Sequence, residues 1–186
     1  MALELIKKYE DEFPKGTPLV CACETGRFED VKRLMSPDGE HLGEKTLEEY
    51  VNQEGKDSRG FERTPLMVAA EKEDLEIVLF LIGNRADPNI VNIDGENALH
   101  FAARMNKNDT KVIELLLTNM TLDSINMKDK SGWTPLDETY HFTDSPIKQK
   151  IIALIRLKGG KANRYDASGR LVGEGNGDLN NLHFRF

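Results

Sequence analysis

Apolar residues recur along this chain in short segments that keep the same order each time. A Thr-Pro-Leu or Asn-Ala-Leu triplet opens segments at four positions, 47, 33 and 37 residues apart: Thr17, Thr64, Asn97 and Thr134. Thr64 is suited to cap a helix through its side chain. Pro65 suits the first helical position, because the backbone N–H that proline lacks would have no hydrogen-bond partner within the helix there. A second apolar stripe follows at helical spacing, as in Ile77, Val78 and Leu81. The pattern predicts pairs of short helices.

A repeat interval of this size predicts a solenoid, in which each helix pair covers the apolar face of its neighbour. The segments TPLVCACETG, TPLMVAAEKE, NALHFAARMN and TPLDETYHFT, with the later endings NRADPN, SIN and KGGKAN, resemble the ankyrin-repeat family. That resemblance implies an all-α solenoid of stacked helix-turn-helix units with projecting β-hairpin-like fingers. It also implies a concave groove that binds another protein.

The repeats divide the chain into one domain covering residues 1–186. Its expected parts are an N-terminal capping helix (1–15), repeat 1 with an insertion (16–56), repeats 2 to 4 (57–91, 92–128 and 129–165), and a C-terminal cap or flexible tail (166–186). Two alternatives stay open for the insertion at 36–56, whose segment EKTLEEYVNQ reads as a short helix. It either packs on the array or forms a second docking edge.

The tail carries a glycine-rich GEGNGD segment and ends in apolar Leu182, Phe184 and Phe186. The glycine-rich segment lacks the Lys-Ser/Thr ending of a phosphate-binding loop and is interpreted as flexible. The final residues either cover the last repeat or form a short linear motif for a partner.

Composition indicates an ordinary globular domain, with 39% apolar and 31% charged residues. No apolar run approaches the roughly 18 residues that span a bilayer, so no membrane insertion is expected. The net charge is -7 and there is no run of Lys or Arg, which disfavours nucleic acid as a partner. Cys21 and Cys23 lack further ligands at zinc spacing and are interpreted as small buried residues in a reducing compartment. The expected location is cytoplasmic, and the nucleus also fits.

The search for catalytic motifs finds no G-x-S-x-G, no Walker-type loop and no H-E-x-x-H. We therefore expect no enzymatic activity, no cofactor and no metal site. His100 lies within the repeat motif, and the ankyrin resemblance implies that it forms hydrogen bonds between adjacent loops.

Fingers that follow the family pattern D-x-x-G-x-T begin at Asp57, Asn92 and Asp129, and a fourth is expected at Asp166. The first finger carries two extra residues, and its Phe61 flanked by arginines has the composition of a binding anchor, although Phe61 folding back onto the array is the alternative. The resemblance points Trp133 toward the groove. The predicted partner-binding residues are Arg59, Phe61, Glu62, Arg63, Ile93, Glu96, Arg104, Met105, Lys130, Trp133, His141 and Phe142.

The favoured function is a non-catalytic protein-interaction module, an adaptor or a stoichiometric inhibitor that binds a partner through its concave groove and finger tips. The alternatives are a regulatory or assembly subunit of a larger enzyme or channel complex, and a microbial or viral effector that uses this fold. The Met at the start and the apparent caps at both ends favour a free-standing chain, which we expect to be monomeric.

Overall fold

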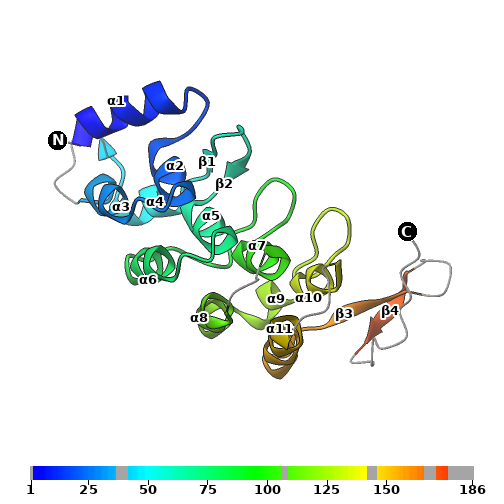
Figure 1. Cartoon of the computed structure of the whole chain (residues 1–186). Coiled ribbons are helices and arrows are strands. Elements are labelled where there is room, and N and C mark those ends of the chain that lie inside the picture. The colour runs from blue at the N-terminus through cyan, green and yellow to red at the C-terminus, as the bar shows by residue number, and fades with distance from the viewer. Residues whose placement is uncertain (1, 37–41, 106–108, 142–145, 166–170, 176–186) are drawn as a thin grey trace.

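The computed structural model describes residues 2–36, 42–105, 109–141, 146–165 and 171–175. Figure 1 shows two rows of helices stepping across the molecule. One row holds the first helix of each repeat: α2 (Pro18–Glu24), α5 (Pro65–Glu71), α7 (Ala98–Met105) and α10 (Pro135–Glu138), the last continued by the 3-10 helix η2 (Thr139–His141). The other row holds the second helices: α3 (Phe28–Leu34), α6 (Leu75–Gly83), α8 (Lys111–Asn119) and α11 (Pro146–Leu157). This arrangement confirms the predicted all-α solenoid.

The first helices begin where the triplets predict. Thr64 accepts a hydrogen bond from the Met67 N–H, and Thr134 accepts one from the Asp137 N–H. Thr17 differs, because its hydroxyl accepts the N–H of Lys56 instead of capping α2. In the first repeat, the Thr17 hydroxyl therefore binds the insertion and does not cap the helix.

A continuous core runs between the two rows of helices. Small residues on the first helices let neighbouring backbones approach, as with buried Ala69 and Ala70 on α5. Cys21 and Cys23 are buried free thiols in the equivalent row, as expected. Burial raises the pKa of the Cys21 thiol to about 12 and raises that of Cys23 as well. Neither thiol is therefore a ready nucleophile at neutral pH.

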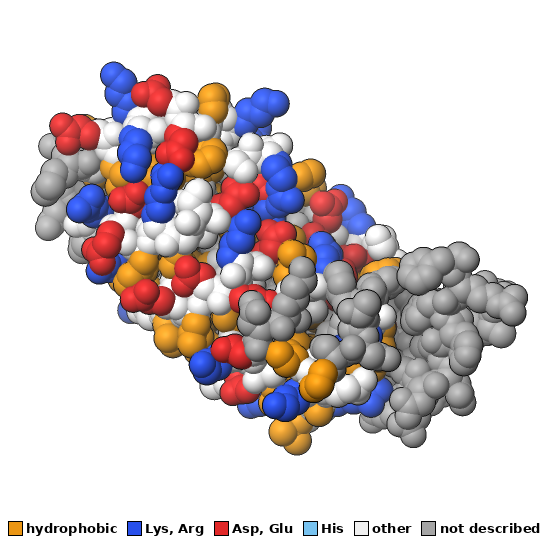
Figure 2. All heavy atoms as spheres, viewed as in Figure 1, with side chains coloured by type: hydrophobic (Ala, Val, Ile, Leu, Met, Phe, Trp, Pro, Cys, Tyr) orange, Lys and Arg blue, Asp and Glu red, His pale blue; other side chains and the backbone are white. Residues whose placement is uncertain are grey.

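The outer edge of the second helices carries some exposed apolar side chains. Figure 2 shows hydrophobic side chains along the lower edge of the molecule, over the second helices. Among the second helices, α6 carries the exposed Leu79 and α11 carries the exposed Leu157. They give a useful contrast with the apolar residues on the fingers.

Both ends of the array carry an additional element. The helix α1 (Ala2–Glu12) packs over α2 and α3 through buried Leu5 and Tyr9, at the position expected for the N-terminal cap. At the other end β3 (Ala162–Tyr165) pairs antiparallel with β4 (Leu171–Gly175). The first half of GEGNGD is therefore strand, which corrects the expectation that the whole segment is flexible. Leu182, Phe184 and Phe186 lie outside the described residues.

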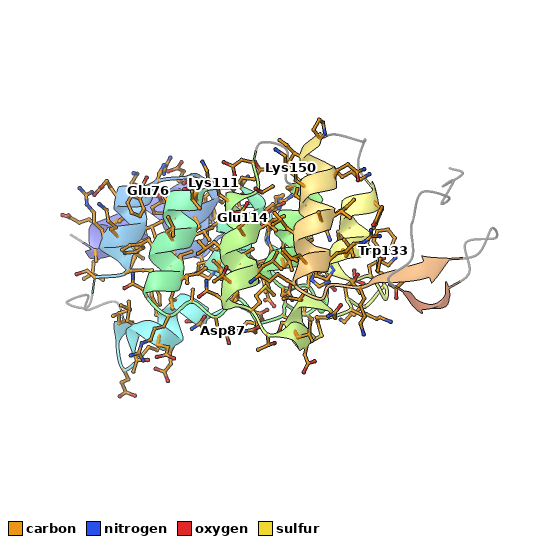
Figure 3. The ribbon with its side chains drawn as sticks, turned by 90° about the horizontal axis from the view of Figure 1, so that it is seen from below. Glu76, Asp87, Lys111, Glu114, Trp133 and Lys150 are labelled. Carbon is orange, nitrogen blue, oxygen red and sulfur yellow. The ribbon has the colours of Figure 1, made fainter. Side chains whose placement is uncertain are left out.

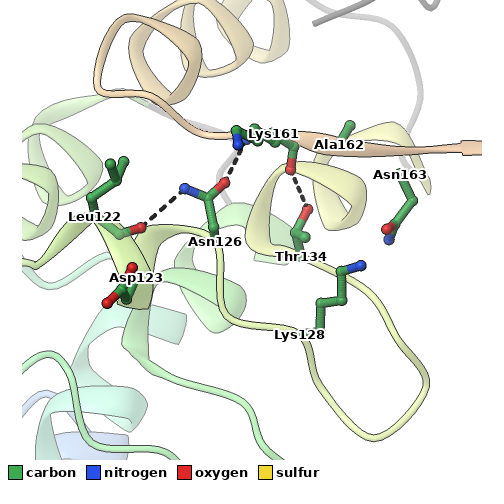
Figure 4. A pocket seen from close by; sticks show the side chains of 8 residues that line it. All are labelled: Leu122, Asp123, Asn126, Lys128, Thr134, Lys161, Ala162 and Asn163. Atoms are coloured by element: carbon green, nitrogen blue, oxygen red, sulfur yellow. Dashed lines mark hydrogen bonds between the residues drawn. The ribbon is translucent and has the colours of Figure 1, made fainter. Parts of the chain in front are cut away.

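A ladder of asparagines joins consecutive repeats through the segments that lead into the fingers. Asn52, Asn89 and Asn126 are spaced 37 residues apart. Their side-chain oxygens accept the backbone N–H of Asp87 at 2.7 Å, of Thr121 at 2.9 Å and of Lys161 at 2.7 Å, in that order. Figure 4 shows the last of these bonds in a small hollow between the third and fourth repeats.

The ladder also explains the insertion in repeat 1. The short helix α4 (Leu47–Asn52) ends on a ladder asparagine, and α9 (Leu122–Ile125) immediately precedes another, Asn126. Figure 3 shows α4 and α9 along the same edge of the array. Val51 is buried, and Leu47 and Tyr50 are partly buried against the core. Of the two alternatives, α4 packs on the array, and its role as a second docking edge stays a hypothesis.

Candidate protein-binding groove

Three fingers share one turn geometry, set by the side chain at the start of each. The oxygen Oδ1 of Asp57, Asn92 or Asp129 accepts two backbone N–H groups of its own finger at 2.8–3.0 Å. A glycine with positive φ completes each turn: Gly60, Gly95 and Gly132. We call these the first (57–64), second (92–97) and third (129–134) fingers. The residues that follow the three glycines, Phe61, Glu96 and Trp133, therefore occupy equivalent places.

The first finger is lengthened by the short hairpin of β1 (Gly55–Lys56) and β2 (Glu62–Arg63). Phe61 is 61% exposed, with the Arg59 guanidinium carbon 5.3 Å from its ring centre. Phe61 therefore does not fold back onto the array, and Glu62 beside it is also exposed.

Arg63 corrects a sequence expectation, because it is not an exposed flanking residue. Its side chain is only 4% exposed and forms ion pairs with Asp57 and Glu71. Although burial opposes ionisation of Asp57, hydrogen bonds from the Phe61 N–H and from Arg63 and Arg59 hold the pKa of Asp57 below its usual range. Arg63 is thus a structural residue that is unavailable to a partner.

Arg104 makes a second network one repeat along. Its guanidinium donates to both carboxylate oxygens of Glu138, at 3.1 Å from Nε and 2.6 Å from Nη2, and also to Glu96. The hydrogen bonds to Glu138 raise the pKa of Arg104, so it stays charged. Phe101 lies between the networks, with its ring centre 5.2 Å from the Arg63 guanidinium carbon and 5.5 Å from that of Arg104. The ring therefore links the two networks through cation–π contacts on the groove side of the first helices.

A hollow of about 440 Å³ opens between the second and third fingers. Its walls are Asp94, Glu96, Arg104, Asp129, Lys130, Ser131, Trp133 and Glu138. The Lys130 N–H donates to the Asp94 carbonyl at 2.8 Å, which ties the two finger tips together. One carboxylate oxygen from each of Glu96, Asp129 and Glu138 lies within 4.8 Å of the others. We call this space the acidic hollow.

Comparison with known proteins agrees with this architecture. A family model described as ankyrin repeats (3 copies) matches residues 66–139. The chain therefore carries ankyrin repeats.

Three curated proteins illustrate what this ankyrin array is similar to. The probable 26S proteasome regulatory subunit p28 of Saccharomyces cerevisiae is 30% identical over 166 residues, which cover 86% of this chain and 63% of that protein. The target of rapamycin complex 2 subunit AVO2 of the same yeast is 24% identical over 119 residues, 64% of this chain and 27% of that protein. The human transient receptor potential cation channel subfamily A member 1 is 37% identical over 71 residues, 38% of this chain and 6% of that protein. The chain spans less than two thirds of each relative's length.

The remaining predicted contact residues are spread over the fingers and first helices. Ile93 on the second finger is 65% exposed, and Met105 at the end of α7 is partly buried. His141 lies in η2, and Phe142 falls outside the described residues. The acidic hollow brings together Glu96, Arg104, Lys130 and Trp133. Their role in binding stays a prediction.

Sequence reasoning missed the carboxylates that complete both networks, among them Glu71 and Glu138. The sequence did carry a signal for Glu71. In repeats 2 and 3, the residue just before the triplet and the residue seven positions after the start of the triplet carry opposite charges. These pairs are Arg63 with Glu71 and Glu96 with Arg104. Glu138 had no such signal, because its contact with Arg104 joins adjacent repeats.

His100 holds the place that the repeat motif implied. Its Nδ1 accepts the Asn97 N–H at 3.1 Å, so Nε2 carries the proton and donates to the Trp133 carbonyl at 3.2 Å. This bond joins α7, in the third repeat, to the third finger.

Among the described residues, no helix is both long enough and apolar enough to cross a membrane.

Proposed function

We propose that this chain is a non-catalytic protein-binding module whose working surface is the three fingers with the groove side of the first helices. The observation that carries the proposal is the exposure of Phe61 and Ile93 on neighbouring fingers. Both are held outward on finger turns with defined hydrogen bonds. Large apolar side chains on a rigid surface are typical of binding anchors.

We further propose that the chain works as a subunit or adaptor of a larger intracellular assembly. Two of its relatives are named as complex subunits, one of the 26S proteasome and one of target of rapamycin complex 2. These names favour a role as a subunit of a complex over a role as an inhibitor that acts alone. They also support a binding role over a catalytic one. The repeats are joined to one another within a single chain, which supports a chain that enters such an assembly as a monomer.

Affinity capture with two matched variants tests the working surface. Phe61→Ala with Trp133→Ala removes aromatic side chains from the finger surface, and Leu79→Ala with Leu157→Ala removes exposed apolar side chains from the second helices. We expect the finger variant to lose its partners, with each substitution costing more than about 1 kcal/mol of binding. The control variant should retain them, and both should keep the wild-type melting temperature. Retention of every partner by the finger variant would contradict the proposal.

Co-sedimentation with purified 26S proteasome tests the assembly that the p28 relationship suggests. The wild-type chain is expected to travel with the particle, and the finger variant to remain at the top of the gradient. If the wild-type chain also stays behind, the proteasome is the wrong assembly, and the partners found by capture replace it.

A further inference from the structure

We infer that the acidic hollow accepts one basic side chain, arginine or lysine, presented by the protein partner. The inference rests on the proposed function and goes one step further, because it names the chemistry of the contact. It concerns the space between the second and third fingers, walled by Trp133 on the third finger and by Glu138 on α10.

The charge balance of the acidic hollow is the first reason. Its walls contribute four carboxylates, Asp94, Glu96, Asp129 and Glu138, against two cations, Arg104 and Lys130. Lys130 pairs with Asp94 at 3.9 Å, and Arg104 pairs with Glu96 and Glu138. Carboxylates held this close repel each other unless a cation lies between them. One further cation would reduce the remaining negative charge.

Asp129 is the carboxylate that an incoming cation would meet. Its Oδ1 is used by the turn, where it accepts the Ser131 and Trp133 N–H groups at 2.8 Å. No ion pair joins Asp129 to a cation among the residues that the structure describes, which include the neighbouring Arg104 and Lys130. Asp129 lies on a tight turn whose glycine has a φ of 84°. Its carboxylate is therefore held in place before any partner arrives.

The Trp133 wall is the second reason, since a basic side chain gains from both a carboxylate and an aromatic face. The same surface uses this combination internally. Arg63 and Arg104 each pair with carboxylates while lying over the ring of Phe101, and Arg59 pairs with Asp57 while lying over Phe61. With about 440 Å³, the acidic hollow has room for a guanidinium or an ammonium group with part of its stem.

Binding can be followed without any label, because Trp133 is the only tryptophan of the chain. The probes are N-acetyl-arginine amide, N-acetyl-lysine amide and the uncharged N-acetyl-citrulline amide, titrated to about 50 mM at constant ionic strength, above the millimolar range of a single contact. We expect a saturable fluorescence change with the two basic probes and none with the citrulline probe. An equal response to citrulline, or no response to any probe, would overturn the inference.

Asp129→Asn tests which group receives the cation. The turn should survive, because Asn92 makes the same two hydrogen bonds at the equivalent position of the second finger. The charge-matched control is Glu76→Gln, since Glu76 is exposed on α6, and Figure 3 places it far along the array from Trp133. We expect Asp129→Asn to weaken the arginine probe about fivefold and Glu76→Gln to leave it unchanged. Equal affinities for the two variants, with circular dichroism unchanged, would reject the acidic hollow as the binding place.

Capture experiments separate this inference from the proposed function. If the Phe61→Ala, Trp133→Ala variant loses its partners while the arginine probe gives no signal, the finger surface binds proteins and the basic-side-chain contact is wrong. If the probe binds but the finger variant retains every partner, the acidic hollow recognises cations and the proposed working surface is wrong.

Discussion

Arg63 and Arg104 lie against the same ring, that of Phe101, yet they belong to opposite kinds of surface. Arg63 is 4% exposed and closes the first finger onto α5 through Asp57 and Glu71. Arg104 is 33% exposed and forms one wall of the acidic hollow. Both arginines pair with a residue eight positions away, Glu71 and Glu96 respectively, with the charges exchanged.

The difference between the two networks comes from their third member. In the first network it is Asp57, a buried carboxylate of the same finger. In the second finger the equivalent residue is Asn92, whose side-chain amide donates to Glu96 at 3.2 Å. The third carboxylate there is Glu138, which comes from the next repeat. A pair completed within its own repeat closes the surface, whereas a pair completed across repeats leaves space between the fingers.

Removing each arginine should break this comparison most strongly. Arg63→Met leaves the buried carboxylate of Asp57 with the exposed Arg59 as its remaining cation, and we expect a loss of about 3 kcal/mol in the free energy of unfolding. Arg104→Met removes a partly exposed cation, for which about 1–2 kcal/mol is expected. Urea unfolding followed by circular dichroism measures both. Equal losses would mean that burial does not distinguish the two networks.

The sequence predicted the helix pairs well, because each is set by local signals. The caps at Thr64 and Thr134, the proline that follows each, and the spacing of Ile77, Val78 and Leu81 are all short-range features. The asparagine endings belong to the family pattern. That pattern does not reveal the ladder, because Asn89 and Asn126 accept the N–H groups of Thr121 and Lys161, about one repeat further along the chain.

The candidate site was harder to predict, because the exposure of a side chain depends on its contacts with other elements. Phe61 and Arg63 are two residues apart and looked alike as candidates, yet one points outward and the other is buried. Arg63 is buried because it contacts Asp57, Glu71 and Phe101, which lie on three different elements. No pattern of spacing within the first finger carries that information.

Exchanging the third members of the networks should sharpen the comparison, with a smaller effect. Asp57→Asn keeps the turn but removes the carboxylate that pairs with Arg63, and about 2 kcal/mol of stability should be lost. Asn92→Asp places a carboxylate where an amide now donates to Glu96, at a cost of about 1 kcal/mol.

The pH dependence of these two variants gives the control. The stability lost through Asn92→Asp should become smaller in acid, because protonation of one carboxylate ends the repulsion between position 92 and Glu96. The stability lost through Asp57→Asn should also become smaller in acid, because the wild-type carboxylate then loses its charge. A constant cost for Asn92→Asp from pH 7 to pH 4 would show that repulsion with Glu96 is not its cause.

The smallest effect concerns His100, which joins α7 to the third finger. Burial lowers the pKa of His100, and its hydrogen bonds require the neutral ring, since Nδ1 accepts the Asn97 N–H. The unfolded chain therefore takes up the proton first as the pH falls. The stability that His100 contributes is complete above its unfolded pKa of about 6.5 and declines as the pH falls toward the lowered folded value.

Urea midpoints measured between pH 7.5 and pH 5 for the wild type and for His100→Gln isolate this contribution from that of the other ionisable groups. We expect the wild type to lose more stability than the variant over this range, because glutamine has no proton to gain. Equal losses would mean that the folded protein accepts the proton as readily as the unfolded chain. The bond from Nε2 to the Trp133 carbonyl would then survive protonation, and the joint beside the acidic hollow would depend on the ring's shape instead of its charge.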